Sequence, residues 1–405
     1  MDRTERQKLG IKRWIQNNGN GILNYAVGVG KTRTALMICE LLWKKNKDVK
    51  ILVSVPTAVL KEQWILETVK LPFFKNIKVE IINTIVKTDY HVDLLIIDEL
   101  HQALSHTLIK IFDKVHYKYF VGLTGTLNRL DGREEILSQF TKVVDRITMQ
   151  EAIQNKWLSP YRYYKVLVDV DLTEYNELNQ KFNTLFAIFD FDFNLAMKLS
   201  TDYKERVKFA NKMGYTVKQI TGFAMAWMRL LQQRKKFVMS HPNKFKVAKK
   251  IISKRQDRKI VTFSATIKDA ESLKIGYTLH SKKKPKENKA ILDEFAKLSH
   301  GVLNSNKSVN AGMNIPDINC EIIISGTSSN IDAVQRVGRA VRAQENKTAE
   351  IFVLVCRNTN EEQWFNKASK GIEYQTITEQ QLDIVLENGY IETVTHEDFV
   401  SNYRF

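Results

Sequence analysis

The chain has 405 residues, of which 43% are hydrophobic and 26% charged, a balance typical of two or three domains that each bury a core. It has no apolar run of about eighteen residues and starts with a polar segment, so it predicts neither a membrane span nor a signal peptide. We therefore expect a cytoplasmic protein. The spacings of its cysteines suit neither a zinc cluster nor a disulfide framework, and we interpret all three as core thiols: Cys39, Cys320 and Cys356.

The formal net charge of +17 is unevenly distributed. Residues 201–300 hold 25 Lys and Arg against 8 Asp and Glu, so this block carries the whole excess. Residues 1–50 add +7, whereas residues 351–405 carry −5. A block this basic predicts a polyanionic partner, because each neutralised phosphate releases a counterion. A solvated helical surface is the alternative.

Short apolar runs alternate with polar loops and helical patterns along the chain, and this alternation predicts an α/β fold. In chain order, the expected strands are residues 21–25, 51–55, 79–82, 94–97, 119–123, 259–263, 301–303, 321–325 and 351–355. They fall into two groups, which predicts two domains, each with a parallel sheet flanked by helices.

Residues 172–240, between the two groups, have apolar side chains at helical spacing and predict a helical insertion. The side chains with this spacing are Leu178, Phe182, Leu185, Phe186, Phe189, Phe223, Trp227, Leu230 and Leu231. Helical periodicity favours a buried core for them, and platforms that stack on bases are the alternative. The domains predicted from these patterns are 1–165, a helical insertion at 166–240, 241–380 and a C-terminal tail at 381–405.

The segment GVGKT at 28–32 has the chemistry of a phosphate-binding loop. Gly28 and Gly30 allow backbone N–H groups to face phosphate oxygens. Lys31 supplies a cation for the β- and γ-phosphates, and Thr32 offers a hydroxyl to Mg²⁺. The segment therefore predicts ATP and Mg²⁺ as ligands.

Asp98 and Glu99 directly follow an expected strand, at the edge where open parallel sheets place their chemistry. Asp98 can hold Mg²⁺ through water, and Glu99 can orient or deprotonate the attacking water. The segment GLTGT at 122–126 ends the next strand with Thr124 and Thr126. These hydroxyls suit a relay of the γ-phosphate status through hydrogen bonds, and an ordinary strand-to-turn junction is the alternative.

The segment QRVGRAVR at 335–342 offers the second half of an ATP site. Arg339 and Arg342 are three positions apart, so both project from one side of a helical turn. Such arginines can act as fingers that stabilise the charge developing during phosphoryl transfer. Because they lie so far along the chain from Lys31, we expect a second domain to close on the nucleotide, so that ATP binding and hydrolysis open and shut a cleft.

Taken in order, these motifs resemble those of the superfamily-two helicases and translocases over roughly residues 1–370. The series is Gln7, GVGKT, VPTAVLKEQW at 55–64, DELH at 98–101, GLTGT, TFSAT at 262–266, NAGMNIP at 310–316 and QRVGRAVR. The resemblance implies two tandem RecA-like domains, with ATP in the cleft and nucleic acid across their tops.

The resemblance also implies roles that the residues alone do not indicate. Gln7, by itself a polar surface residue, would recognise adenine, and Gln335 would contact the nucleotide. Gly312 and Asn314 resemble the motif that links nucleic acid to the ATP site. The positions that look like the family's contacts to backbone phosphates are Pro56, Thr57, Thr84, Asn304 and Ser305.

Three positions depart from the family pattern, although none removes a catalytic group. Tyr25 stands where the phosphate-binding loop usually has Gly or Ala, Gly125 where Ala is frequent, and Asn314 where Asp is common. The string GLTGTLNRLDG, followed by EAIQNKWLSPYRYY at 151–164, looks like the phage branch-migration helicases of the UvsW type rather than the DEAD-box proteins that clamp RNA.

We therefore expect an ATP-dependent DNA helicase or translocase that remodels forks, Holliday junctions or R-loops in a bacterial or phage-infected cell. It would act as a monomer on branched, duplex or single-stranded DNA. If the basic block follows DNA phosphates, the contacts include Lys235, Lys236, Lys249 and Lys250. The alternatives are an RNA helicase and an ATP-gated clamp that does not unwind, because the sequence identifies no strand-separating wedge.

Overall fold

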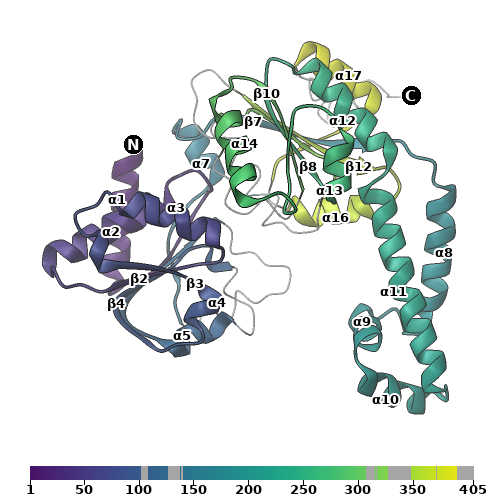
Figure 1. The fold of residues 1–405 in the computed structure, drawn as a ribbon, viewed down its shortest axis with the longest axis horizontal. Helices are drawn as coiled ribbons and strands as arrows, with labels where there is room; N and C mark the ends of the chain where they lie inside the picture. Colours follow the sequence, from purple (N-terminus) through teal and green to yellow (C-terminus); the bar gives the residue numbers. More distant parts are fainter. Residues whose placement is uncertain are drawn as a thin grey trace, which may run out of the picture.

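The computed structural model describes residues 1–101, 108–125, 137, 140–306, 315, 317–326, 348–370 and 372–389. These residues form two α/β domains and a helical arm that extends away from the second domain (Figure 1). Each domain contains a parallel sheet flanked by helices, which confirms the predicted fold class of tandem RecA-like domains with a helical insertion.

Domain 1 has a sheet with the strand order β3-β2-β4-β5-β1-β6. Its strands are β1 (Asn20–Tyr25), β2 (Ile51–Val55), β3 (Ile77–Ile81), β4 (Tyr90–Ile97), β5 (Val115–Thr124) and β6 (Val143–Ile147). Its helices are α1 (Arg3–Gln16), α2 (Lys31–Lys45), α3 (Ala58–Thr68), α4 (Ile82–Ile85), α5 (Ile111–Lys114) and α7 (Met149–Gln154). Successive residues such as Leu52 and Val53 are buried in separate apolar clusters on the two faces of the sheet. Burial on both faces explains why the strands are continuous apolar runs.

Domain 2 has a second parallel sheet with the strand order β13-β7-β12-β11-β8-β10-β9. Its strands are β7 (Tyr161–Val168), β8 (Lys259–Ser264), β9 (Tyr277–Leu279), β10 (Gly301–Asn306), β11 (Cys320–Ile323), β12 (Ala349–Cys356) and β13 (Gln375–Thr378). Its helices are α12 (Pro242–Lys254), α13 (Ile267–Ser272), α14 (Pro285–Lys297), α16 (Asn360–Ala368) and α17 (Glu379–Asn388). Helices α12 and α17 share an apolar cluster with one face of the sheet, whereas α14 and α16 pack against the other face.

The structure corrects two of the predicted domain boundaries. The boundary at residue 165 divides β7, which pairs along its length with β12 and also with β13, so that domain 2 begins before residue 166. Helix α17 packs against α12, β7 and β13, so that domain 2 also continues past residue 380. The first difference arises because Tyr161 pairs with Ala349, and the second because α17 packs on domain 2. Local sequence patterns do not report contacts between such distant segments.

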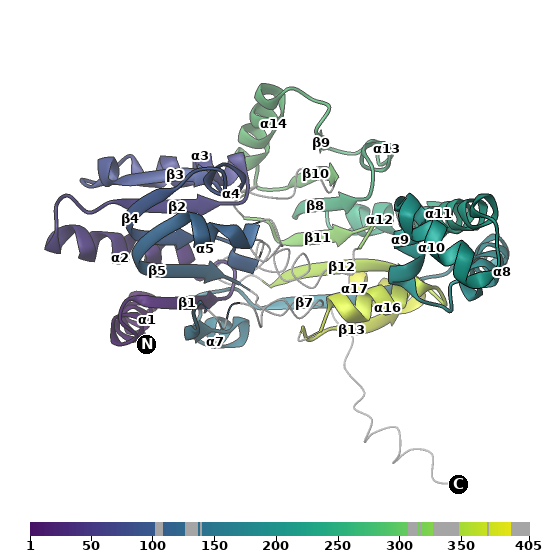
Figure 2. The same cartoon turned by 90° about the horizontal axis from the view of Figure 1, so that it is seen from below.

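The arm consists of α8 (Thr173–Ala187), α9 (Phe193–Thr201), α10 (Tyr203–Met213) and α11 (Val217–Met239). Figures 1 and 2 show α8 beside the long helix α11, with α9 and α10 folded against the far part of the arm. Thr216 and Gln219 form a capping box at the start of α11. At its end, Lys244 and Ser325 donate to the carbonyls of Val238 and Met239, which ties the last turn to domain 2.

The aromatic residues of the arm form its core, as predicted. Trp227 is completely buried, and the rings of Phe182 and Phe186 lie with their centroids 5.5 and 5.6 Å from it. Phe189 is likewise completely buried. The buried rings of Trp227, Phe189 and Phe182 are therefore unavailable for stacking on bases, whereas Phe186 is partly buried against them.

Most other structural predictions are confirmed as well. Every strand predicted from an apolar run is present, whereas β6, β7, β9 and β13 were not predicted. The three cysteines are buried and free of disulfides, as expected for core thiols. In the described part of the chain, each helix is too short or too polar to cross a bilayer.

Candidate active site

The phosphate-binding loop connects strand β1, which lies between β5 and β6 in the sheet, to helix α2. Gly28 and Gly30 have φ angles of 88° and 98°, a left-handed conformation that residues with a side chain rarely adopt. A Cβ on residue 30 would lie 2.7 Å from Nε2 of Gln7, so only glycine fits there. Gly30 caps α2 without a side-chain hydrogen bond, which leaves the first N–H groups of the helix available to an anion. Lys31 and Thr32 begin the helix at this point.

Gln7, on α1, is completely buried against this loop. Its Nε2 donates to the carbonyl of Val29 at 2.9 Å and, more weakly, to that of Gly30 at 3.4 Å. Its Oε1 is buried without a hydrogen-bond partner among the described residues. A buried acceptor that lacks a donor fits the amino group of adenine. The structure also excludes the alternative that Gln7 is a surface residue.

Tyr25, which departs from the family pattern, is accommodated by the surrounding fold. Its buried hydroxyl donates to Oδ2 of Asp145 at 2.7 Å, and Asp145 also pairs with Arg6 at 2.7 Å. A Cβ on Gly10 would lie 1.9 Å from the hydroxyl oxygen of Tyr25. Glycine at position 10 therefore makes room for tyrosine at position 25. Burial raises the pKa of Tyr25, so the hydroxyl stays a neutral donor.

Asp98 and Glu99 follow β4 directly. Trp64 Nε1 donates to Asp98 at 2.8 Å, and the backbone N–H of Glu99 donates to the other oxygen of Asp98 at 2.9 Å. Burial, together with the charge of Glu99, raises the pKa of Asp98 to about 6 against the opposing effect of Lys31. Glu99 has a φ of 50°, a left-handed strain that is common at functional sites. Its Oε1 lies 3.6 Å from Nζ of Lys31, so the structure brings the three charged groups together.

His101 is a site residue to which the motifs assigned no role. Its Nδ1 lies 3.3 Å from Oγ1 of Thr124 and 3.5 Å from Oε2 of Glu99, and its side chain is buried. It therefore connects the carboxylate after β4 to the threonine that ends β5. The letters DELH contain this residue, but only the adjacency of β4 and β5 shows what it contacts.

Several predicted site residues lie outside the described residues: Thr126, Gly312, Asn314, Gln335, Arg339 and Arg342. The described residues therefore provide only the half of the site that belongs to domain 1, and the contribution of domain 2 stays a prediction.

Known proteins resemble this chain in both halves. Residues 1–93 match the family described as type III restriction enzyme, res subunit, and residues 243–344 match the helicase conserved C-terminal domain. The DNA 3'-5' translocase XPB2 of Sulfurisphaera tokodaii is 24% identical over 373 residues, which cover 86% of this chain and 80% of that protein. The putative ATP-dependent RNA helicase QP509L of African swine fever virus is 30% identical over 151 residues, 31% of this chain and 28% of that protein.

The fold has a solved counterpart as well. The crystal structure of the Pyrococcus furiosus Hef helicase domain has a TM-score of 0.55 and 16% identity, and the match covers 89% of this chain and 96% of that one. The chain is a superfamily-two helicase. It is accordingly a nucleic-acid-dependent ATPase, and the binding of ATP at the loop around Lys31 stays a prediction.

Three predicted nucleic-acid contacts of the helicase lie at one edge of domain 1. Pro56 and Thr57 follow β2, and Thr84 is exposed on α4, which follows β3. Because parallel strands end at the same edge, these residues share that edge with the phosphate-binding loop. Thr57 also has a structural role, since its Oγ1 accepts from the N–H of Leu60 and caps α3.

Asn304 and Ser305 correct a sequence prediction, because the fold of the helicase uses both side chains internally. Both are completely buried in β10. The Asn304 side chain accepts from Thr262 at 2.8 Å and donates to the carbonyls of Ile275 and Tyr277 at 2.6 and 3.2 Å. In this structure, neither side chain is available to a backbone phosphate.

The basic block of the helicase is only partly a surface feature. Lys235, Lys236 and Lys249 are exposed, whereas Lys250 pairs with Asp383 of α17. Other cations of the block form internal ion pairs, as Arg255 does with Glu350 at 2.7 Å. The net charge of the block therefore overstates the charge that a ligand encounters.

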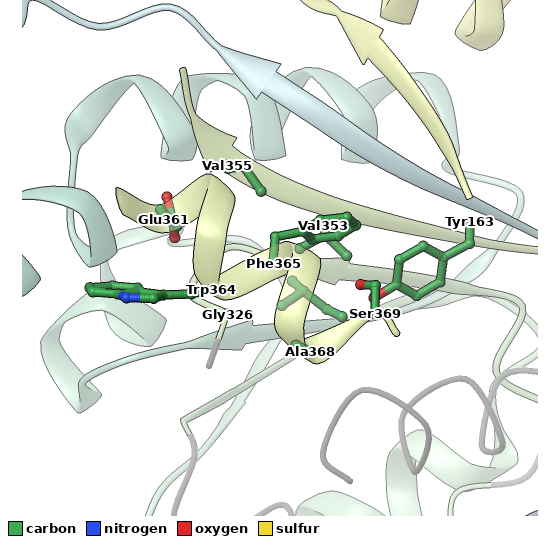
Figure 3. A pocket seen from close by; sticks show the side chains of 10 residues that line it. Tyr163, Gly326, Val353, Val355, Glu361, Trp364, Phe365, Ala368 and Ser369 are labelled. Carbon is green, nitrogen blue, oxygen red and sulfur yellow. The ribbon is translucent and has the colours of Figure 1, made fainter. Parts of the chain in front are cut away.

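A pocket lies beside α16 (Figure 3), and its lining includes neither the phosphate-binding loop nor the carboxylates of domain 1. Its lining is largely apolar, with Tyr163, Val353 and Phe365 among the side chains. Glu361 lines it too, but the carboxylate of Glu361 pairs with Lys244 at 2.6 Å. Among the described residues, the lining therefore offers a phosphate no unpaired cation, although the hydroxyl of Ser369 has no hydrogen-bond partner there.

Proposed function

We propose that this helicase is an ATP-dependent DNA translocase that remodels branched or duplex DNA, such as forks, Holliday junctions or R-loops. The observation that carries the choice of DNA is the extent of the similarity. A relative named a DNA translocase matches 86% of the chain, whereas one named an RNA helicase matches 31%. The string GLTGTLNRLDG favours the UvsW type. We place the protein, as a monomer on DNA, in the cytoplasm of a bacterium or phage-infected cell.

In the proposed reaction, domain 1 binds and orients the nucleotide. Gln7 recognises the adenine, Lys31 binds the β- and γ-phosphates, and Glu99 orients or deprotonates the attacking water. Thr32 and Asp98 hold Mg²⁺, which supplies positive charge against the phosphate oxygens when bound. These roles are supported by the distance of 3.6 Å between Lys31 and Glu99 and by the buried carboxylate of Asp98.

Domain 2 completes the proposed site and links it to DNA. Arg339 and Arg342 reach the γ-phosphate as fingers when the cleft closes, and Gln335 contacts the nucleotide. Thr124 and Thr126 respond to the γ-phosphate from domain 1. The contact of Thr124 with His101, which also lies 3.5 Å from Glu99, supports this relay. The motif residues of domain 2 that join DNA to this relay are Gly312 and Asn314.

We propose that DNA is held at two places. Pro56, Thr57 and Thr84 contact it at the edge of domain 1. The second contact is helix α11, which has no acidic residue and exposes Lys218, Arg229, Lys235 and Lys236. Helices α8 and α10 differ, since α8 pairs Lys181 with Glu177 and α10 pairs Lys208 with Glu205. Cations without such partners attract phosphates, so α11 would hold a duplex while the cleft opens and closes.

ATPase stimulation by forked DNA, single-stranded DNA and RNA, compared at equal nucleotide concentrations, tests the proposal. We expect forked DNA to stimulate hydrolysis most and RNA least. Strongest stimulation by RNA would contradict the proposal in favour of an RNA helicase. Strand release from a labelled fork separates a motor from a clamp, because an ATP-gated clamp hydrolyses ATP on DNA but releases no strand.

A further inference from the structure

Two side chains of α1 hold the carbonyl groups of the phosphate-binding loop. Arg3 donates through Nε to the carbonyl of Val29 at 2.8 Å and through Nη2 to that of Gly28 at 2.5 Å. Gln7 donates to the carbonyl of Val29 from one turn further along the helix. The family motifs account for Gln7, whereas they assign nothing to Arg3.

The direction of these carbonyls determines the direction of the amides that bind phosphate. A planar trans peptide places its C=O and the following N–H on opposite sides. A hydrogen bond that holds the carbonyls of Gly28 and Val29 towards α1 therefore turns the next N–H groups, those of Val29 and Gly30, away from α1. The N–H of Val29 donates to the carbonyl of Ala26 at 3.3 Å, so that of Gly30 is the one left for a phosphate. Both glycines have left-handed φ angles, and glycine permits several peptide orientations, so the loop needs such an external restraint.

Helix α1 provides a fixed platform for this restraint. Arg6 pairs with Asp145 and Glu151, both at 2.7 Å, which ties α1 to β6 and α7. Trp14 Nε1 donates to the carbonyl of Phe120 at 2.8 Å, which ties the helix to β5. Because α1 is anchored to three elements, Arg3 acts on the loop from a defined position.

We propose that Arg3 is a positioning residue for ATP, which aims the amides of the phosphate-binding loop at the phosphates and adds positive charge beside them. Arg3 is partly buried and has no ion pair with a carboxylate in the described part of the chain. Its charge is therefore available to favour a nearby anion. The proposal concerns ATP binding alone and does not depend on which nucleic acid the helicase uses.

The KM for ATP and kcat, measured without nucleic acid, test this role. Arg3→Ala should raise the KM about tenfold, since two hydrogen bonds from a charged donor are lost, with kcat changed less than about twofold. Arg3→Gln, which keeps one donor and loses the charge, should have a KM between the two. Lys12→Ala is the control, because Lys12 is an exposed cation of the same helix α1 and should keep the wild-type KM.

Competition by inorganic tripolyphosphate separates the two ends of the nucleotide. Arg3→Ala should weaken tripolyphosphate and ATP binding by the same factor. Gln7→Ala, which loses a contact to the base as well as its bond to the loop, should weaken ATP binding more than tripolyphosphate binding. Melting curves establish that the variants are folded. A wild-type KM in Arg3→Ala or in Arg3→Gln would overturn the proposal. Weaker binding of ATP with unchanged binding of tripolyphosphate would also overturn it, because Arg3 would then act on the base.

Discussion

Each α/β domain contains a pair of lysine and glutamate, buried in domain 2 and partly buried in domain 1, and the two pairs differ in their hydrogen bonds. In domain 2, Lys244 and Glu361 lie 2.6 Å apart, and the other oxygen of Glu361 accepts from the N–H of Cys356 at 2.9 Å. In domain 1, Lys31 and Glu99 are 3.6 Å apart, and Nζ of Lys31 is buried without a hydrogen-bond partner among the described residues. We call the pair in domain 2 the closed pair, because its charged groups have hydrogen-bond partners. We call the pair in domain 1 the open pair, because Nζ of Lys31 has none among the described residues.

The difference indicates which buried charges a ligand can use. A buried polar group without a partner costs about 1–3 kcal/mol, so an open pair persists only where the fold imposes it or a ligand offsets it. Phosphate oxygens can accept hydrogen bonds from Nζ of Lys31. Nζ of Lys244 already donates to Glu361 and to the carbonyl of Val238. We therefore infer that the open pair serves the reaction and the closed pair serves stability.

Removing the carboxylate of the open pair should have the largest effect. Glu99→Gln should still bind ATP, with kcat lowered by about 10³ or more, because a group that orients or deprotonates water is lost. Phosphate release and nucleotide titration measure the two quantities. Glu62→Gln, on the exposed side of α3, is the control. Wild-type hydrolysis by Glu99→Gln would show that the open pair is not catalytic.

The next effect tests whether domain 2 contributes charge to the open site. Arg339→Ala should lower kcat by about 10³ with a smaller change in nucleotide affinity, as the loss of an arginine finger does. Arg357→Ala, which removes a partly exposed arginine of the same domain, should leave kcat unchanged. An unchanged kcat in Arg339→Ala would give QRVGRAVR a structural role.

Breaking the closed pair should affect stability and leave the chemistry intact. Lys244→Met leaves Glu361 buried and unpaired, so we expect a loss of about 3–5 kcal/mol in the free energy of unfolding of domain 2. The double variant with Glu361→Leu should regain most of it. Denaturant unfolding measures both, and kcat per folded molecule should stay at the wild-type value.

The exposed pair of Lys44 and Glu40, also at 2.6 Å, is the matched control for burial. Lys44→Met should cost less than about 1 kcal/mol, because water screens that pair. Equal losses in Lys44→Met and Lys244→Met would mean that burial does not decide the strength of the closed pair.

The smallest effect concerns cations that lie on the surface. Replacing the four lysines by glutamine should weaken binding to all DNA sequences alike and flatten the salt dependence, by about 0.7–0.9 in the log–log slope for each lost contact. The lysines are Lys235, Lys236, Lys249 and Lys250. Because Lys250 already pairs with Asp383, we expect three lost contacts instead of four. ATP hydrolysis without DNA should barely change.

A fork and a plain single strand, titrated over a salt series, measure this effect. Lys8→Gln with Lys12→Gln, on the exposed side of α1, provides the control. If the quadruple variant keeps the wild-type affinities and slopes, the basic block is a solvated face, and the DNA contacts reduce to those at the edge of domain 1.

Much of the fold and part of the site were predictable because their signals are local. A buried parallel strand is a short apolar run, so the strands that lead into GVGKT and DELH were predictable from composition alone. The phosphate-binding loop was predictable too, since its chemistry needs glycines, a lysine and a hydroxyl next to one another. The aromatic core of the arm follows from helical spacing, which places Phe182 and Phe186 on one face.

The rest depended on contacts between distant segments. The sequence around Asn304 does not tell whether its side chain faces a phosphate. In this structure the side chain binds Thr262 and two carbonyls inside the sheet. The absence of a side chain at Gly10 is explained only by the space that the hydroxyl of Tyr25 occupies. Strand β7 belongs to domain 2 only because it pairs with β12. Composition and spacing determine which elements form and which chemistry the chain carries. Packing alone decides whether a side chain is open to a ligand or consumed by the fold, because burial and hydrogen-bond partners come from residues far away in sequence.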